Sequence, residues 1–449
     1  MLLTVVTLVT ILGPVPAYAD SPTDETTIRS SVTLVPMGGK SSSRTLPQEQ
    51  RGVGESAQAY EERRAKPYLP LQEALAEQRA SNQFHDVFLR EESGLAAADP
   101  VEDWPTKEEC IQAYAPRDFE GEWQHRNNYS ACQVYFVYFN FLECQPTTPP
   151  ACAPVGQTEA RAVFLGKGWA TARNVDWDVH LDSWRLVWGR EEPTQLFKID
   201  VECARYTTTD ECDLSSSRNT RTLTEWKANG LHNVFGTTAT PTPWPGDKKP
   251  QDKRAYFQFT PKITAMSTGI STPTYWVVSR CDNAAYVTGA GCIFLGSWSR
   301  FVMDYTYANY KESVEFIWTA MTDLESVKPG SVGLYVPGNQ HAIPSQRVPL
   351  TRNYYGTQSR TKVQAECVRL FGPNYTVGPN GVIRDCDEYP FASTYQSANF
   401  DTVGTATTWA VKALDRSHNR SAGSILGEYY VLDHRLDEDP FFVDIINTP

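Results

Sequence analysis

The stretch Arg384-Asp385-Cys386-Asp387-Glu388-Tyr389-Pro390-Phe391-Ala392-Ser393-Thr394 brings an arginine, a cysteine and three carboxylates together within five residues. Acidic runs on protein surfaces are usually solvated and carry no chemistry. This run leads directly into apolar residues, so we expect its carboxylates at the edge of a core. Two adjacent acids held there, Asp387 and Glu388, suit a hard metal ion or general-base catalysis.

The segments around this stretch predict an α+β region. A helix is expected from Asn309, where Val314, Ile317, Trp318, Met321 and Leu324 form one apolar stripe. After the acidic stretch we expect a strand over 407–414, a turn, and a second helix over about 420–432. This order places a base at a strand end opposite a residue on the helix.

Asn419 stands at the predicted start of that second helix. Its ordinary role in such a place is the N-cap. Its functional role would be an oxygen ligand to Mg²⁺ or Mn²⁺, since hard cations prefer Asp, Glu and Asn oxygens and need no histidine.

The middle of the chain, residues 101–280, is predicted to be a β-rich, antiparallel, sandwich-like domain. Val175, Trp177, Val179 and Leu181 alternate with polar residues, the period-2 pattern of a half-buried strand. Further short strands are separated by turn-rich loops. The polar partners Asp176, Asp178 and His180 are interpreted as the solvated face of the strand rather than a metal site.

Ten cysteines occur in neighbouring couples, and none forms a C-x-x-C pair. This spacing disfavours zinc binding and favours local disulfides in an oxidising compartment. The predicted pairs are Cys110–Cys132, Cys144–Cys152, Cys203–Cys212, Cys281–Cys292 and Cys367–Cys386.

The N-terminal residues are interpreted as an export signal. The apolar run at 1–19 is too short to span a membrane comfortably and ends in Ala17-Tyr18-Ala19, a cleavage pattern. Residues 20–100 are polar and predicted to be a flexible segment or propeptide. The mature protein is therefore expected to be secreted, extracellular and free of the membrane.

The net charge of −12 gives the chain no global attraction to nucleic acid or anionic membranes. Any surface that binds a polyanion must be local, or assisted by a cation.

Several motifs resemble the NucA/NucB-type deoxyribonuclease domain of secreted bacterial proteins. Cys386 to Thr394 looks like the family signature. Asn419 to Gly423, with Leu426, Gly427 and Tyr430, is similar to its second motif, and Arg435 to Asp437 with Asp439 to Phe441 and Val443 resembles its closing segment. Residues 280–283 and 291–294 look like the entry to longer members, so the nuclease-like domain is placed at 281–449.

The resemblance implies a C-terminal α+β domain with a ββα-metal core that cuts DNA, with RNA left open, using a divalent cation, Mg²⁺ or Mn²⁺. Mapped by motif, Asp387 is the general base, Glu388 a catalytic carboxylate and metal ligand, and Asn419 a metal ligand on the helix. Arg384 and Arg420 would contact phosphate. The roles of Asp387 and Glu388 could be reversed.

Gln396 stands where family members commonly carry a glutamate. If that glutamate is a metal ligand, the domain here is weakened or inactive; if it only supports ligands, Gln396 keeps the hydrogen bonds. The alternatives to a secreted endonuclease are a binding or adhesive protein with a degenerate nuclease-like domain, and an antibacterial effector nuclease.

Overall fold

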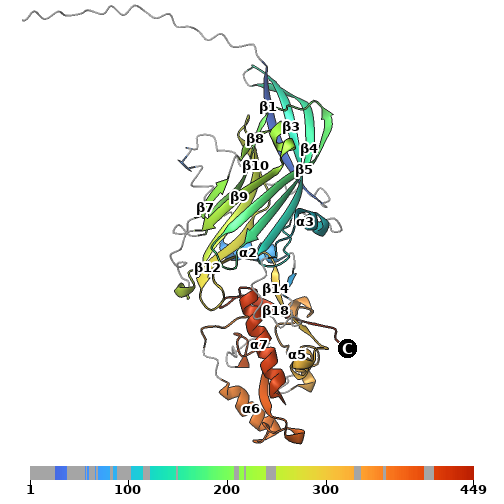
Figure 1. Ribbon diagram of the computed structural model, residues 1–449, viewed down its shortest axis with the longest axis vertical. Coiled ribbons are helices and arrows are strands. Elements are labelled where there is room, and N and C mark those ends of the chain that lie inside the picture. Colours follow the sequence, from blue (N-terminus) through green and yellow to red (C-terminus); the bar gives the residue numbers. More distant parts are fainter. Residues whose placement is uncertain are drawn as a thin grey trace, which may run out of the picture.

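The structure is a computed structural model that describes residues 26–37, 56, 58–59, 66, 69–80, 84–87, 103–114, 122–147, 150–206, 212–216, 219–238, 249–327, 335–356, 360–398 and 409–449. The predicted signal peptide, 1–19, lies outside these residues. Figure 1 shows an elongated molecule with long, curved sheets toward one end. The helices α5 (Lys311–Thr322), α6 (Thr361–Phe371) and α7 (Arg416–Leu432) lie toward the other.

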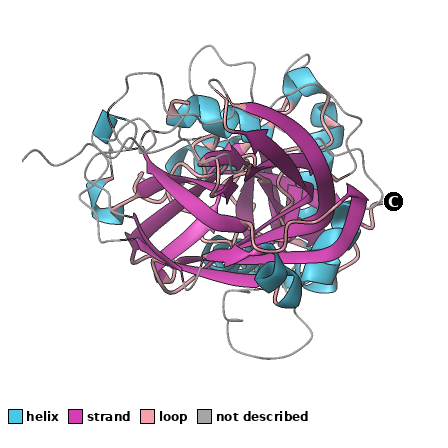
Figure 2. Cartoon of the chain, turned by 90° about the horizontal axis from the view of Figure 1, so that it is seen from above, coloured by secondary structure: helices cyan, strands magenta, loops and turns pink. Residues whose placement is uncertain are grey.

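Two antiparallel six-stranded sheets form the larger part, here called the β-body. The first has the strand order β1-β3-β4-β5-β9-β7, with bounds Thr27–Pro36, Ser130–Gln145, Ala151–Gly168, Val175–Gly189, Leu231–Thr238 and Cys212–Ser216. The second has the order β13-β12-β10-β6-β8, with β11 paired to β10 and bounds Gly289–Phe294, Val277–Ala284, Ala255–Ala265, Leu196–Arg205, Thr220–Thr222 and Ile270–Pro273. Seen along the long axis, the strands curl around a shared interior (Figure 2).

The alternation predicted for β5 is confirmed. Val175, Trp177, Val179 and Leu181 are buried in a core to which both sheets contribute. The polar residues on the opposite face bond to neighbouring strands: Asp176 accepts from the Trp169 indole, and Asp178 pairs with Lys167 and Asn233. The β-rich antiparallel prediction for the middle of the chain is therefore confirmed, and these acids have structural partners.

All five predicted disulfides form, joining Cys110–Cys132, Cys144–Cys152, Cys203–Cys212, Cys281–Cys292 and Cys367–Cys386. The first ties α3 (Lys107–Tyr114) to β3. The short helix α4 (Leu223–Ala228) begins with a capping box between Thr222 and Glu225.

The prediction that 20–100 is a flexible polar segment is wrong for three pieces of it. Strand β1 pairs antiparallel with β3 from Thr27 to Pro36. Helix α2 (Leu71–Arg79) packs on the β-body through Leu71, Ala74 and Leu75, and β2 (Phe84–Val87) pairs with β14 (Trp298–Asp304). A helix within about 56–81 agrees with the sequence, whereas strand β1 was missed because its partner β3 lies far along the chain.

The C-terminal part has its own core. The four-stranded sheet β15-β18-β14-β2, in which β15 is Leu350–Thr351 and β18 is Pro440–Ile446, packs with α5 and α7. The predicted boundary at residue 281 is too early, because β12 and β13 pair within the second sheet of the β-body. Strand β14 is the first element after them that belongs to the C-terminal sheet.

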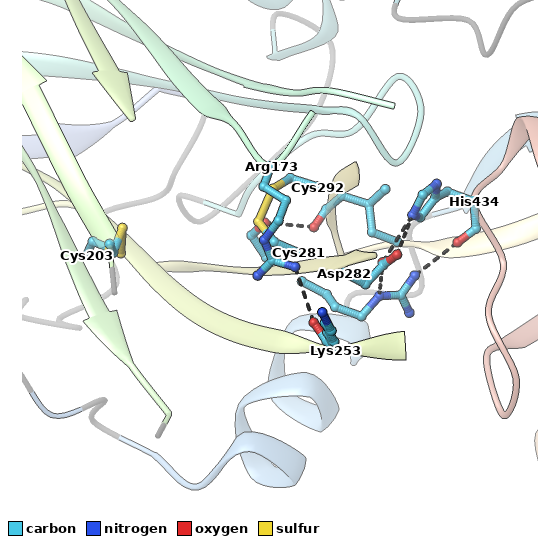
Figure 3. Close-up of a disulfide and its surroundings, with 11 residues drawn as sticks. Arg173, Cys203, Lys253, Cys281, Asp282, Cys292 and His434 are labelled. Atoms are coloured by element: carbon cyan, nitrogen blue, oxygen red, sulfur yellow. Dashed lines mark hydrogen bonds and ion pairs between the residues drawn. A yellow bond between two sulfur atoms is a disulfide. The ribbon is translucent and has the colours of Figure 1, made fainter. Parts of the chain in front are cut away.

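A buried ion-pair cluster joins the two parts. Arg280, on β12, binds both carboxylate oxygens of Asp439 at 2.6 and 2.7 Å, Asp282 at 3.1 Å and the His434 carbonyl at 3.0 Å. The His434 ring lies 2.9 Å from Asp282, next to the Cys281–Cys292 disulfide (Figure 3). We call Arg280, Asp282, His434 and Asp439 the interdomain cluster; it fixes the segment after α7 to the β-body.

Replacing Arg280 by alanine should destabilise the protein strongly, because Asp282 and Asp439 would remain buried without their cation. The expected loss is about 3–5 kcal/mol of unfolding free energy, measured by urea titration. Arg185→Ala is the matched control: its side chain is 66% exposed and pairs with Glu159, so a loss within about 1 kcal/mol is expected. Equal effects of the two substitutions would contradict the role given to Arg280.

The same cluster makes stability depend on acid. Burial alone would raise the pKa of Asp439, but Arg280 and Arg435 outweigh it and hold that pKa well below the ordinary value of 3.8. Because the folded state holds the proton less tightly, this stabilisation is complete above the unfolded pKa and is lost as the pH falls below it. Asp439→Asn should therefore be less stable than wild type near neutral pH, and the gap in urea midpoint should narrow below about pH 4. A gap that stays constant with pH would refute this.

Candidate active site

The acidic stretch forms strand β16 (Arg384–Tyr389), which pairs antiparallel with β17 (Ala410–Asp415). The Cys367–Cys386 disulfide attaches α6 to one face of this hairpin. A small core of Val363, Cys367, Cys386, Ala398 and Val411 fills the space beneath. The carboxylates of Asp387 and Glu388 thus stand at the edge of a core, as predicted.

Helix α7 follows β17 directly and begins four residues earlier than predicted. Its N-cap is Asp415, whose side chain accepts from the Ser417 N–H at 2.7 Å. The Asp415 N–H in turn donates to Glu312 of α5 at 2.8 Å. The N-cap role considered for Asn419 is therefore wrong: Asn419 lies within the first turns of α7, and its amide is not needed for capping.

A pocket of about 300 Å³ brings Asp387, Glu388 and Asn419 together. Arg360, just before α6, lines it as well. The remaining wall comes from α5, α7 and the segment after β16, namely Ile317, Phe391, Ala392, Ser393, Ala422, Gly423 and Leu426. The pocket lies at the lower end of the size range of ligand sites and combines two acids, one amide and one cation with apolar walls.

Burial sets the proton affinity of both acids. Desolvation raises the pKa of Asp387 to about 6, although the Glu388 N–H at 2.9 Å and the charge of Arg360 oppose the rise. Desolvation likewise raises the pKa of Glu388 to about 7, opposed by Arg360 and increased by the negative charge of Asp387. Such values place both groups where protons are exchanged near neutral pH.

The donor set at the pocket fits a hard divalent cation. Glu388 is 3% exposed, and within the part of the chain that the structure describes neither of its carboxylate oxygens has a hydrogen-bond partner of normal geometry. In the described part of the chain no three His, Cys, Asp or Glu side chains cluster closely enough to hold a metal by themselves. Mg²⁺ is commonly bound by one or two carboxylates, waters and substrate phosphates, which Glu388, Asn419 and a substrate would supply.

The two arginines predicted to contact phosphate, Arg384 and Arg420, are not among the residues that line the pocket. Arg384 does not line the pocket; its guanidinium packs against Gly378 of the preceding turn. Arg420 is 71% exposed and lies 3.8 Å from Asp385, outside the pocket wall. Arg360 was missed because it precedes the acidic stretch by more than twenty residues. The sequence pointed to Arg360 only indirectly, because the predicted Cys367–Cys386 disulfide places α6, which begins just after Arg360, next to β16.

Gln396 also lies outside the pocket. Its Oε1 accepts from the Thr351 N–H at 2.9 Å, and its Nε2 donates to the Thr351 hydroxyl at 3.0 Å. These bonds attach the segment after β16 to β15. Gln396 therefore supports the wall of the site through β15.

Comparison with known proteins assigns the region that contains the pocket. Residues 341–444 match the family model Deoxyribonuclease NucA/NucB. No curated protein and no solved structure matches the chain. The resemblance inferred from the acidic stretch is thus confirmed for the C-terminal region, over residues 341–444.

Replacing Glu388 by glutamine should stabilise the metal-free protein. The pKa of Glu388 is about 7 in the folded protein and 4.5 in the unfolded chain. Because the folded state binds the proton more tightly, the free energy of unfolding falls as the pH rises from 4.5 to 7. At pH 8 in EDTA, the free energy of unfolding of the variant should exceed that of wild type by about 2–3 kcal/mol, and the difference should vanish below about pH 4.5.

The control is Glu315→Gln, a carboxylate of α5 that is 38% exposed, which should leave the pH dependence unchanged. Adding Mn²⁺ should raise the urea midpoint of wild type and not that of Glu388→Gln. A stability difference that does not vary with pH would contradict the buried, unpartnered state of Glu388.

Proposed function

We propose that the NucA/NucB domain at residues 341–444 makes this protein a secreted endonuclease that hydrolyses phosphodiester bonds of DNA and depends on a divalent metal. The observation that carries the proposal is the pair of buried Glu388 oxygens, which have no hydrogen-bond partner of normal geometry among the described residues and line a pocket shared with Asp387 and Asn419. Buried polar groups without partners are rare and call for an explanation, and a bound cation supplies one.

We assign β16, β17 and α7 as the ββα-metal unit. The proposed ligands are Glu388, at the end of the first strand, and Asn419, in the first turns of the helix. Hard cations of this kind are Mg²⁺ and Mn²⁺. When bound, the cation would polarise the scissile phosphate and stabilise the charge that develops on it.

Asp387 is the proposed general base. Its carboxyl is half-buried and accepts from the Glu388 N–H, which leaves oxygen capacity for a water in the pocket. With a pKa of about 6 it is ionised near neutral pH and basic enough to take a proton from that water as the oxygen attacks phosphorus. The oxygen of one nucleotide then leaves, and a second water protonates it.

Arg360 is the proposed phosphate-binding cation of the pocket. It donates to the Cys386 carbonyl, which holds its guanidinium beside the two acids. A fixed cation there favours the charge that builds up on the phosphate. Arg420 is proposed to contact a phosphate farther along the strand, since it is exposed and follows Asn419 on the same helix turn. These local cations allow an acidic protein to bind a polyanion.

Export is supported by two features. The five disulfides suit an oxidising compartment, and residues 1–19 have the pattern of a signal peptide. Gln396 bonds to Thr351 and lies outside the pocket wall, which supports the endonuclease hypothesis over a degenerate site.

Asp387→Ala should lose metal-dependent cutting of plasmid DNA by about 10²–10⁴-fold, the usual contribution of a general base. Asp385→Asn is the matched control two residues earlier on the same strand, where the acid pairs with Arg416 at 3.1 Å. It should retain cutting. Conversion of supercoiled plasmid would be followed with Mg²⁺ or Mn²⁺ and with EDTA.

Two results would overturn the proposal. One is cutting by wild type that EDTA does not affect. The other is full activity of Asp387→Ala.

A further inference from the structure

A cluster of tyrosines at the border of the β-body and the C-terminal part contains a ring that the proposed mechanism does not use. Tyr354, shortly after β15, is 43% exposed. Its ring stacks on Tyr286, in the turn between β12 and β13, with ring centroids 3.7 Å apart and an interplanar angle of 13°. The β-body thus supports an aromatic ring of the nuclease domain from below.

Among the residues that the structure describes, the ring and guanidinium neighbours of this stack leave the outer face of Tyr354 uncovered. The Arg352 guanidinium lies 5.0 Å from the Tyr286 ring and 5.3 Å from the Tyr354 ring, and the Tyr355 ring lies 5.5 and 4.9 Å from them. A group above the outer face of Tyr354 would be much farther from Tyr286 than from Tyr354. Arg352 and Tyr355 are each almost equally distant from the two stacked rings, so both lie at the side of the stack.

The stack is held rigidly by acids at its edge. The backbone N–H groups of Tyr354 and Tyr355 donate to the Asp437 carboxylate at 2.7 and 3.3 Å. The Tyr286 hydroxyl donates to Asp252 at 2.9 Å and accepts from the Asp437 N–H at 3.0 Å. A ring held in this way loses little conformational entropy when a flat ligand stacks on it.

Two contacts connect the stack to the pocket wall. The Asn353 N–H donates to the carbonyl of Ser393, a pocket residue, at 2.7 Å. Arg352 also lies 4.4 Å from the Tyr430 ring, whose hydroxyl is 3.0 Å from the Ser393 hydroxyl. Tyr354 follows Asn353 directly, and consecutive Cα atoms are about 3.8 Å apart. A nucleic-acid strand advances about 3.4 Å or more per nucleotide. A strand with a phosphate in the pocket would therefore reach Tyr354 within a few nucleotides.

We propose that Tyr354 is a stacking platform for an unpaired nucleobase of the substrate strand, within a few nucleotides of the scissile phosphate, and that Tyr286 positions it. This inference rests on the proposed nuclease function and names its substrate class as single-stranded or locally unpaired DNA. Base–aromatic stacking contributes about 1–3 kcal/mol per base and tolerates any sequence, since every base has a π-face. It gives the β-body a part in substrate binding.

The test measures binding of a fluorescein-labelled thymidine 12-mer to the full chain in EDTA, by fluorescence anisotropy. Tyr354→Ala should weaken binding about 5- to 150-fold, the equivalent of one lost stack, and Tyr354→Trp should preserve it. Tyr354→Leu, which keeps apolar volume without an aromatic face, should behave like the alanine variant. Phe371→Ala is the matched control, with the same 43% exposure on α6, and should bind as wild type does.

A second arm separates stacking from a general loss of structure. Removing bases from the oligonucleotide, to leave an abasic strand, should weaken wild type and leave the affinity of Tyr354→Ala almost unchanged. If Tyr354→Ala and Tyr354→Leu bind within twofold of wild type, while cutting still requires metal and Asp387, the stacking inference alone is overturned. A wild-type chain that neither binds the strand nor cuts plasmid overturns the proposed function together with this inference.

Discussion

The burial of Arg280 is the constraint on which the arrangement of the molecule depends. A buried guanidinium must have its charge and donors satisfied, and Arg280 obtains its partners from both sides of the border: Asp282 from its own strand, and Asp439 and the His434 carbonyl from the segment after α7. Removing one member leaves a buried charge without its partner. The free-energy cost of that unpaired charge is far larger than the net stabilisation that the intact cluster provides. The two parts are thereby held in one arrangement.

Helix α7 transmits this constraint to the site. It runs from Arg416, past Asn419 at the pocket, to Leu432, immediately before the segment that binds Arg280. Its buried face, Ala422, Ile425, Leu426, Tyr429 and Tyr430, packs in the C-terminal core. The capping bond at Asp415 and its contact with Glu312 fix the other end. The amide of Asn419 therefore has a defined position opposite β16, which a site for a small, geometrically demanding cation requires.

In the pocket, by contrast, the burial of a charged group is not compensated by the described residues. Glu388 is buried, its oxygens have no hydrogen-bond partner of normal geometry among the described residues, and burial raises its pKa. A sequence optimised only for stability would place a neutral or apolar residue there. The polar pair Gln396 and Thr351, a short distance away, is fully bonded. Gln396 therefore belongs to the residues that support the wall of the pocket, and Glu388 to those available to substrate and cation.

The sequence by itself determined the features that depend on short separations. The strand pattern of β5, the apolar stripe of α5 and the five disulfides between cysteines no more than 22 residues apart were all predictable. The grouping of Asp387, Glu388 and Asn419 followed from the order of motifs.

Only the tertiary structure decided the rest. Strand β1 pairs with a partner more than a hundred residues away, Arg360 reaches the pocket through a disulfide-linked helix, and Tyr286 of the β-body supports Tyr354. Local periodicity reports which face of an element is buried. It does not report which distant element buries that face, because that choice depends on packing and charge compensation across the whole chain.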